Sequence, residues 1–517
     1  MSILERAIGY LSPETAAKRE EARAKAEQFR AKANAYRKAG ESLSQRGYEA
    51  AARSRRNAGW LTKDSGANAE TRGALSIIRA RSRDLVRNNG YARRGIGSIV
   101  ANTVGTGIIA RVEGRSAGAQ KKLREAWKTW AESTHCDADG LHDFYGLQSL
   151  AFRAMVEGGE CLIVRHRLNA AESRLEDGGF RAPIELQVLE GDFIDSSIER
   201  ESGSTRVIQG VEFDAKGRRT AYYLFPKHPG NGNPGSSRRV PAEDVIHLFN
   251  VERAGQVRGV PWAAPIVVPT RDLDEYEDAE LVRRKVAACF AGFVIEQERP
   301  ETPTGPAPAL SEKIEPGILE VLPAGKDIRF NTPPSVTGYG EYSTAMLRKV
   351  ASGLELPYEE LTGDYSQVNF SSGRMGWLGF QRNIDRWQWH VLVPRLCVRV
   401  WEWWKEAAAI TGVRTEGAIA TWTPPRREMI DPVKETAATI SQIRGGLMTR
   451  AEAIRRQGYD PTEVYEEYKS DNDAADKHGL VFDSDPRKTV ANGKLQDAGG
   501  DSPPDGANAA PGGEDAE

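Results

Sequence analysis

The densest group of side chains able to bind a metal lies between His135 and Asp143, where the sequence reads HCDADGLHD. Zinc and calcium both use ligands of these types. A zinc finger needs a second ligand pair at a set spacing, and a calcium loop needs glycine at the position that His142 occupies. Aspartates in such turns often cap helices instead. The pattern therefore favours capping, and we predict no metal site.

Four carboxylates near expected strands could in principle hold the metal ions of a nuclease. They are Glu157, Glu160, Asp192 and Asp195. No motif relates them to one another, and we interpret them as solvated side chains. A metal-dependent DNA nuclease that uses the cluster from His135 to Asp143 is kept as the alternative of enzymatic class.

Other catalytic patterns are missing from the sequence. It contains no G-x-x-x-x-G-K-[ST] loop for nucleotide phosphates and no nucleophile elbow. The glycines at 95, 97, 105 and 107 do not follow a strand as a dinucleotide-binding loop requires, so we interpret them as turn and close-packing positions. The sequence thus predicts a protein that is not an enzyme and uses no cofactor.

Composition indicates which class of protein contains these residues. Hydrophobic residues make up 39% and charged residues 28% of the 517, as in soluble proteins. No apolar run approaches the ~18 residues that cross a membrane, and no signal-peptide core is present, so we expect no membrane partner and an origin in the cytoplasm. Cys136, Cys161, Cys289 and Cys397 are far apart, which favours reduced, mostly buried thiols.

The formal net charge of -2 argues against tight binding of nucleic acid, which usually requires a basic excess. Charge is also unevenly placed, because Lys and Arg are dense between Lys18 and Arg94 while the chain after Asp497 is acidic. Either DNA is not the partner or its contact is weak, and the two ends of the chain should meet different partners.

Helical spacing accounts for most of the chain. Residues 13–40 are rich in Ala and in opposite charges three or four apart, which predicts an exposed helical arm. Buried-face spacing predicts a continuous helix over residues 71–101 and another over 119–133. Between residues 160 and 250, short segments rich in Val, Ile, Tyr and Phe alternate with Gly-rich turns, which indicates a β-rich subdomain. We therefore expect an α+β fold that is predominantly helical.

The second half of the chain is again mostly helical. A helix over 266–290 has acidic residues first and basic residues last, which suits the helix dipole, and a second helix ends before Pro357. A polar loop over 364–373, DYSQVNFSSG, precedes a tryptophan-rich helix to residue 410 that Pro394 should kink. We expect its tryptophans in cores and subunit contacts. Three short capped helices and a disordered tail from residue 488 follow.

Three stretches resemble the lambda-type family of phage portal proteins. They read ARSRDLVRNNGYARRGIGSIVANTVGTGI, GVPWAAPIVVPTRDLDEYEDAELVRRKVAACFAGFVIE and VASGLELPYEELTGDYSQVNFSSGRMGWLGFQR. The resemblance covers residues 70–485 and carries no catalytic signature. It implies a closed ring, usually of twelve copies, at the unique vertex of the capsid, through which DNA is packaged and ejected.

The resemblance also implies the regions of the portal fold. In chain order these are an N-terminal arm (1–70), wing (71–260), first stem helix (261–290), clip (291–338), second stem helix (339–358), tunnel-loop region (359–375), long helix and wing return (376–428), crown (429–487) and tail (488–517).

Site residues follow from this division. A polar, acidic tunnel loop would touch double-stranded DNA weakly and without sequence preference, because strong phosphate contacts would hold the DNA. Its lumen-facing residues would be Asp364, Tyr365, Gln367, Asn369 and Phe370. The charged stem would join neighbouring copies, through Asp274, Glu277, Arg283, Arg284 and Lys285.

The resemblance further implies partners and location. The clip would dock the terminase large subunit and later the head-completion or tail connector proteins, while the major capsid and scaffold proteins would surround the ring. The protein would lie in the host cytoplasm during assembly and at the portal vertex of the virion afterwards. A capsid or scaffold component without DNA contact, suggested by the acidic balance, is the other alternative.

Overall fold

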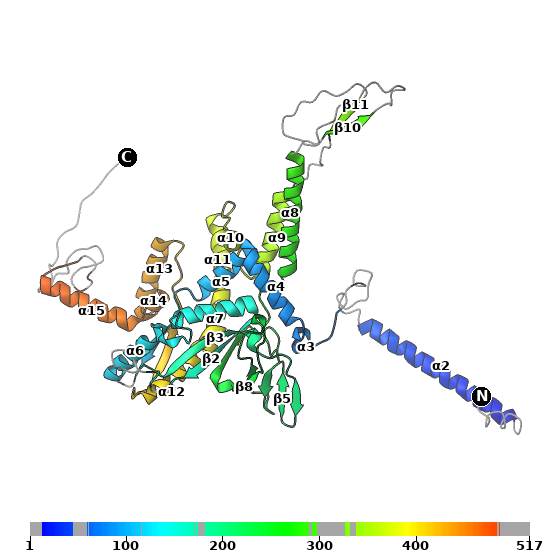
Figure 1. Cartoon of the computed structure of the whole chain (residues 1–517), viewed down its shortest axis with the longest axis horizontal. Helices are drawn as coiled ribbons and strands as arrows, with labels where there is room; N and C mark the ends of the chain where they lie inside the picture. The colour runs from blue at the N-terminus through cyan, green and yellow to red at the C-terminus, as the bar shows by residue number, and fades with distance from the viewer. Residues whose placement is uncertain are drawn as a thin grey trace, which may run out of the picture. The chain divides into compact units, whose positions relative to one another are not determined.

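The computed structural model describes residues 13–44, 59, 62–114, 116–169, 171–173, 181–288, 292–296, 326–330, 338–482, 485 and 487 (Figure 1). Most of the expected clip, the tail from residue 488 and Cys289 lie outside these residues. The chain divides into two units, Met1–Gly66 and Ala67–Glu517. None of the described helices is both long enough and apolar enough to span a membrane.

The first unit contains helix α2 (Pro13–Ser44), which ends four residues beyond the expected Gly40. Its described side chains, between Glu14 and Ala35, are all exposed. Pairs such as Lys25 and Glu21, whose Nζ and Oε1 atoms are 2.8 Å apart, follow the spacing seen in the sequence. The expected exposed helical arm is therefore confirmed.

The second unit begins with α3 (Ala67–Thr71), α4 (Leu75–Asn88) and α5 (Gly90–Thr103). The expectation of one continuous helix over residues 71–101 is wrong. Asn89 adopts an extended conformation, with φ -108° and ψ 122°, and its side-chain oxygen accepts the backbone N–H of Ala92 at 2.9 Å. Asn89 caps α5, and the helix therefore breaks between two segments that each have apolar spacing.

The β-rich part expected between residues 160 and 250 consists of two antiparallel sheets. In the first, β2 (Glu160–Arg167) lies between β3 (Ile184–Glu190) and β9 (Val245–Phe249). The second has five strands in sequence order. They are β4 (Arg200–Ser202), β5 (Thr205–Ile208), β6 (Val211–Phe213), β7 (Arg219–Leu224) and β8 (Arg238–Pro241). Strands β4 and β8 are short, charged and largely exposed, so their sequences gave no β signal.

The main core lies between α6 (Ala117–Ala131), α7 (Phe144–Gly158) and α12 (Val398–Ile410). Trp127 is at its centre, with ring centroids 5.2 Å from Trp401, 5.3 Å from Trp404 and 5.6 Å from Phe144. These separations allow edge-on aromatic packing. The expectation that tryptophans of the long helix fill a core is confirmed for Trp387, Trp401, Trp403 and Trp404, whereas Trp389 is 48% exposed.

A two-stranded sheet joins distant parts of the unit. Strand β1 (Ile109–Glu113) pairs in antiparallel fashion with β12 (Ile419–Thr423). Close by, Gly107 has φ +111°, and a Cβ there would lie 2.5 Å from the Tyr145 ring. The close-packing interpretation also holds for Gly95 and for Gly105, which has φ +50°, but it is wrong for Gly97, which faces open space.

The long tryptophan-rich helix is present and has three parts. It runs through α11 (Phe370–Trp387), a π-helical segment (Gln388–Cys397) and α12. The expected disturbance at Pro394 takes the form of these wider turns, because proline has no N–H to give to the α-helical ladder. Inside this segment Gln388 is buried, and its side-chain amide donates to the Thr103 carbonyl at 2.7 Å.

The expected pair of long helices is α8 (Val267–Ala288) and α9 (Tyr339–Gly353), which lie side by side (Figure 1). The antiparallel strands β10 (Gly292–Glu296) and β11 (Lys326–Phe330) lie between them in sequence. Short helix α10 (Tyr358–Thr362) follows α9. Short 3-10 helices occur at Thr134–Cys136, Gly191–Phe193, Pro229–Asn231 and Ala242–Asp244.

The three capped helices are α13 (Pro432–Arg444), α14 (Arg450–Arg456) and α15 (Pro461–His478). Asp431 and Thr449 accept the backbone N–H three residues ahead, at 3.2 and 3.1 Å, and Asp460 accepts that of Thr462 at 2.8 Å. The predicted caps are confirmed, and so is the α+β, predominantly helical class.

Candidate functional site

The polar segment from His135 to Asp143 serves the turn before α7. The Asp137 carboxylate accepts the backbone N–H groups of residues 139, 141 and 142 at 2.9–3.1 Å, and Asp143 caps α7 through the N–H of Gly146 at 2.7 Å. Burial raises the pKa of the Cys136 thiol to about 12, so this thiol is no ready metal ligand. The predicted capping role is confirmed.

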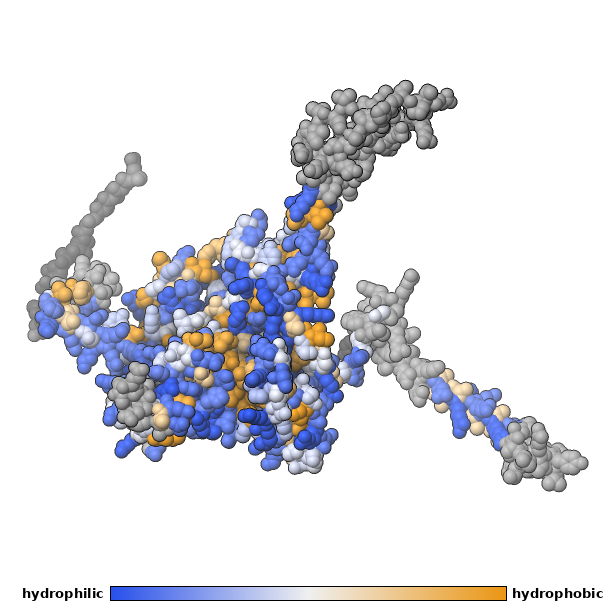
Figure 2. Space-filling view, viewed as in Figure 1, coloured by the Kyte–Doolittle hydropathy of each residue, from blue (hydrophilic) through white to orange (hydrophobic). Residues whose placement is uncertain are grey.

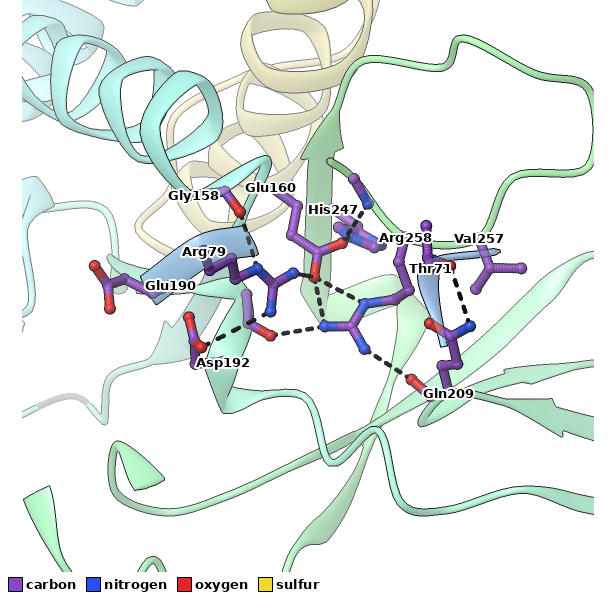
Figure 3. A network of polar contacts seen from close by, with 12 residues as sticks. Thr71, Arg79, Gly158, Glu160, Glu190, Asp192, Gln209, His247, Val257 and Arg258 are labelled. Atoms are coloured by element: carbon purple, nitrogen blue, oxygen red, sulfur yellow. Dashed lines mark hydrogen bonds and ion pairs between the residues drawn. The ribbon is translucent and has the colours of Figure 1, made fainter. Parts of the chain in front are cut away.

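Glu160, the first residue of β2, lies at the centre of a buried polar network (Figure 3). One carboxylate oxygen accepts hydrogen bonds from the guanidinium groups of Arg79 and Arg258. The other accepts the backbone N–H of Gly259 at 2.7 Å and lies 3.0 Å from His247 Nε2. The interpretation of Glu160 as a solvated side chain is wrong, because the residue is only 1% exposed.

Elements from distant parts of the sequence meet at this carboxylate. Arg79 comes from α4 and also donates to the Gly158 carbonyl at the end of α7, at 2.9 Å. Arg258 comes from the segment between β9 and α8, and it donates to the Gln209 and Gly191 carbonyls at 3.0 and 2.8 Å. Through these hydrogen bonds the network connects α4, α7 and both sheets to the segment that precedes α8.

Electrostatics explain why the carboxylate stays charged. Burial alone would raise the pKa of Glu160, but the two guanidinium groups and His247 hold that pKa well below its usual range. Burial lowers the pKa of His247 to about 4 despite the neighbouring carboxylate. We infer a neutral imidazole that donates from Nε2 to Glu160, since Nδ1 has no hydrogen-bond partner in the described part of the chain.

The remaining carboxylates proposed for a nuclease are also engaged. Asp195 is buried and accepts the hydroxyls of Ser197 and Ser237 at 2.5 and 2.7 Å, so its solvated interpretation is wrong as well. Glu190, Asp192 and His228 could together hold a metal ion. The Arg83 guanidinium already lies 2.5 Å from Asp192 and 3.2 Å from Glu190. The Arg83 guanidinium therefore already supplies positive charge where a metal ion would bind, which disfavours the nuclease.

The polar loop between α10 and α11 is shorter than expected. Asn369 caps α11 by accepting the N–H of Ser372 at 2.8 Å, so the helix begins at Phe370. The expectation that the loop extends to Gly373 is wrong, because the Asn, Ser and Gly residues of NFSSG suit a helix N-terminus as well as a loop. The described loop covers residues 363–369.

The five residues predicted to face a channel are all exposed. Asp364 accepts the N–H of Ser366 at 3.0 Å, which with the Ser366 hydroxyl lowers the pKa of its carboxyl. The Tyr365 hydroxyl donates to Glu360 at 3.3 Å, while the Gln367 side chain is exposed. The structure therefore brings these residues together on one exposed turn and the first turn of α11.

Basic residues that the loop sequence lacks come from other elements. The Arg94 side chain of α5 donates to the Glu360 carbonyl at 3.0 Å and lies beside Gly363, where a Cβ would be 3.1 Å from its guanidinium carbon. Arg374, in the first turns of α11, is exposed. Sequence reasoning missed Arg94 because 266 residues separate it from its Glu360 partner.

The predicted stem residues contact groups of their own chain. Arg283 and Arg284 both donate to Glu280, at 2.6–2.9 Å, and lower the pKa of that carboxyl to about 2. Asp274 accepts the side-chain amide of Asn89 at 2.8 Å. Glu277 is partly buried, so burial and nearby Asp274 raise its pKa, and Lys285 is exposed.

Tyrosines complete the contact between α8 and α9. The Tyr276 ring of α8 stacks on Tyr339 of α9, with centroids 6.0 Å apart, and lies 4.5 Å from that of Tyr342. The Arg284 guanidinium lies 5.1 Å from the Tyr339 centroid. No spacing rule in the sequence pointed to this contact.

Comparison with known proteins decides the family. A model of the family described as "Phage portal protein, lambda family" matches residues 53–388. The chain belongs to this family. The resemblance inferred from the sequence is thereby confirmed.

Curated members of the portal family are similar over most of their length. A "Probable portal protein" of Halomonas phage phiHAP-1 is 26% identical over 82% of this chain and 86% of its own. "Portal protein B" of Escherichia phage lambda is 23% identical over 75% of this chain and 81% of its own. The "Portal protein" of Escherichia phage N15 is 23% identical, covering 79% and 86%.

Solved structures include similar chains at lower identity. One, described as "Neck of native GTA particle computed with C12 symmetry", has a TM-score of 0.46 and 14% identity, covering 74% of this chain and 94% of its own. The HK97 family phage portal protein from Corynebacterium diphtheriae has a TM-score of 0.29 and 10% identity, covering 73% and 99%.

Proposed function

We propose that this chain forms a closed ring of twelve copies at one capsid vertex, and that double-stranded DNA crosses the ring during packaging and ejection. Membership of the portal family, over residues 53–388, is the observation that carries this proposal. A ring needs a heterologous interface, in which one face of each copy meets a different face of the next and rotation closes the circle. The chain would have a structural rather than an enzymatic role.

The regions of the portal fold are assigned on the same basis. The two sheets and α4 to α7 would form the wing, α8 and α9 the stem, and α13 to α15 the crown. The segment between α8 and α9 would be the clip, which docks the terminase large subunit and then the head-completion or tail connector proteins. Capsid and scaffold proteins would surround the ring, first in the host cytoplasm and finally in the virion.

The channel contact is proposed for the exposed loop before α11. Asp364, Tyr365, Gln367, Asn369 and Phe370 would face the DNA. A protein that neutralises six to ten phosphates loses about 10³–10⁵ in affinity between 50 and 200 mM salt, which shows how firmly such contacts hold DNA. Exposed acidic and uncharged polar side chains hold it less firmly, so a duplex can slide past them.

Electron microscopy of the purified full-length chain tests the ring. We expect isolated rings with a central hole wide enough for a duplex, and sedimentation should give a single assembled species. A chain that stays monomeric under assembly conditions would refute the proposal. Closed shells without a bore would instead support the capsid component, and cleavage of a plasmid with bound metal would support the nuclease.

The loop is tested by adding positive charge. Rings of Asp364→Lys/Gln367→Lys should bind duplex DNA more tightly, with a steeper dependence on salt, and should package DNA more slowly at low salt. The control is Glu201→Lys/Ser204→Lys, which adds the same charge to exposed positions around β4 and β5. Equal DNA affinity and packaging rate in the two variants would remove the loop from the channel.

A further inference from the structure

The formal net charge of -2 is the sum of two parts of opposite sign. The first unit, Met1–Gly66, contains 14 Lys and Arg residues against 8 Asp and Glu residues, which gives +6. The rest of the chain contains 57 Lys and Arg against 65 Asp and Glu, which gives -8. The basic charge is thus concentrated in a unit to which the proposed channel contact assigns no role.

Four arginines follow one side of α2, at intervals of four, seven and seven positions, which align along a helix. They are Arg19, Arg23, Arg30 and Arg37. We call this the arginine side of α2. Between its arginines this side holds Ala26, Ala33 and Asn34, and the nearest acidic residues, Glu20 and Glu27, lie along one flank of it.

Lysines occupy another side of the same helix, together with acidic residues. Lys25 and Lys32 each follow an arginine of the arginine side by two positions, which places them nearly opposite it. Lys25 Nζ lies 2.8 Å from Glu21 Oε1. Glu14 precedes Lys18 by the same four positions. Because carboxylates are mixed with the lysines, the arginine side presents the most concentrated positive charge of α2.

The composition of α2 favours a polyanion over a protein surface or a membrane. Phe29, which is 74% exposed, is the only large apolar residue between Pro13 and Ala35. Protein interfaces have cores that are poor in Lys and Glu, and a helix at a lipid surface needs a continuous apolar face. On the face that Figure 2 shows, the described part of α2 has hydrophilic residues with paler ones between them. Helix α2 meets neither requirement.

Duplex DNA has the chemistry that the arginine side fits. It carries one negative charge per about 1.7 Å of its axis, so phosphates are available to cations spaced along a helix. Arg23 and Arg30 are about 10 Å apart along α2, at about 1.5 Å per residue. A guanidinium group can form two parallel hydrogen bonds with a phosphate. Such contacts do not read the base sequence, as DNA of any sequence requires.

We propose that the arginine side of α2 binds the phosphates of duplex DNA without sequence preference. This contact rests on the proposed function, which brings DNA to the protein, and it adds a DNA site opposite in character to the channel loop. The loop would let DNA slide, whereas the twelve copies of α2 in a ring would hold it with an affinity that falls as salt rises.

DNA binding by the full-length chain tests the arginine side against the lysine side. Arg23→Gln/Arg30→Gln removes two charges from the arginine side. Lys25→Gln/Lys32→Gln is the control, because it removes two charges from the same helix at the same spacing. All four side chains are exposed, and glutamine favours a helix about as well as Arg and Lys do, so α2 should persist in both variants.

Fluorescence anisotropy with a labelled duplex gives the affinity at two salt concentrations. Loss of two phosphate contacts should lower the slope of log affinity against log salt by about 1.8, so the ratio of affinities at 50 and 200 mM salt should shrink about 12-fold. The lysine control should change that ratio by less than about threefold. Equal changes in the two variants, or no binding of wild-type protein at 50 mM salt, would overturn the proposal.

Two further measurements separate the remaining outcomes. Duplex DNA should slow the hydrogen exchange of α2 backbone amides at least threefold in wild type and in the lysine variant but not in the arginine variant, and equal slowing in all three would overturn the arginine side. Polyglutamate that displaced DNA at equal charge concentration would indicate an acidic protein partner and overturn the assignment to DNA. A protein that formed no rings would fail the proposed function, whereas rings whose DNA affinity was the same in all variants would refute only this contact.

Discussion

Replacing Glu160 by Gln keeps the size of the side chain and removes the charge at the centre of the buried network. Arg79 and Arg258, which are 4% and 1% exposed, would lose the carboxylate between them. The amide would also present an NH2 group to a site where guanidinium groups, the Gly259 N–H and His247 all act as donors. The substitution therefore leaves buried charge uncompensated and adds a clash of donors.

The magnitude follows from burial. Breaking a buried ion pair by removing one partner costs about 3–5 kcal/mol, because the other charge stays behind in a medium of low polarity. Arg79 keeps Asp192, whose carboxylate is 3.9 Å away, whereas Arg258 keeps the Gln209 and Gly191 carbonyls but no second carboxylate among the described residues. We expect Glu160→Gln to lower the free energy of unfolding by about 3–4 kcal/mol.

Urea unfolding followed by tryptophan fluorescence measures this loss. Glu212→Gln is a matched control, since Glu212 also accepts from an arginine, Arg239, at 2.7 Å, but that arginine is half exposed. Glu212 itself is mostly buried, but Arg239 stays half in water once the charge is removed, so this loss should be about 1 kcal/mol. A loss below about 1 kcal/mol for Glu160→Gln, or one equal to that of the control, would refute the account of the network as a buried ionic centre.

Three further predictions concern stability and assembly. His247 has a pKa of about 4 in the folded chain and an ordinary value of 6.5, so the unfolded chain takes up its proton first as the pH falls. The free energy of unfolding should therefore fall by about 3 kcal/mol between pH 6.5 and pH 4, and His247→Gln should flatten that pH dependence. Gly259→Ala should cost about 1–3 kcal/mol in urea unfolding, because its Cβ would lie 2.1 Å from the Gly159 carbonyl oxygen; a neutral result would contradict the close packing. Arg283→Gln/Arg284→Gln should reduce ring yield while leaving the urea midpoint of the single chain nearly unchanged, because both arginines pair with Glu280 on the surface of one helix; rings of normal yield and salt tolerance would count against a stem interface.

Local chemistry made much of the fold predictable. Helix α13 begins where Asp431 and Pro432 occur together, and α14 begins where Thr449 precedes Glu452 by three residues, since capping depends on a few consecutive side chains. The tryptophans of α12 were assigned to a core because so large an apolar area is rarely left in water.

What the sequence could not give depends on partners far along the chain. Glu160 appeared as one carboxylate among several because Arg258, its partner, is 98 residues away. Asn89 looked like an ordinary helix residue, since its role as a cap becomes visible only once the chain turns there. The channel-facing residues and the stem interface remain predictions because both concern contacts with DNA or with another copy.

The pairing of β1 with β12 has a consequence for how the chain is made. Ile109 pairs with Thr423, so the first strand must wait for more than 300 further residues before its partner exists. At about 5–20 residues per second of translation, that wait is roughly 15–60 s. During this interval the ribosome holds a nascent chain whose first strand has an unpaired edge. A chain truncated before residue 419 would keep that edge permanently, and we expect such a fragment to require chaperones and to aggregate when released.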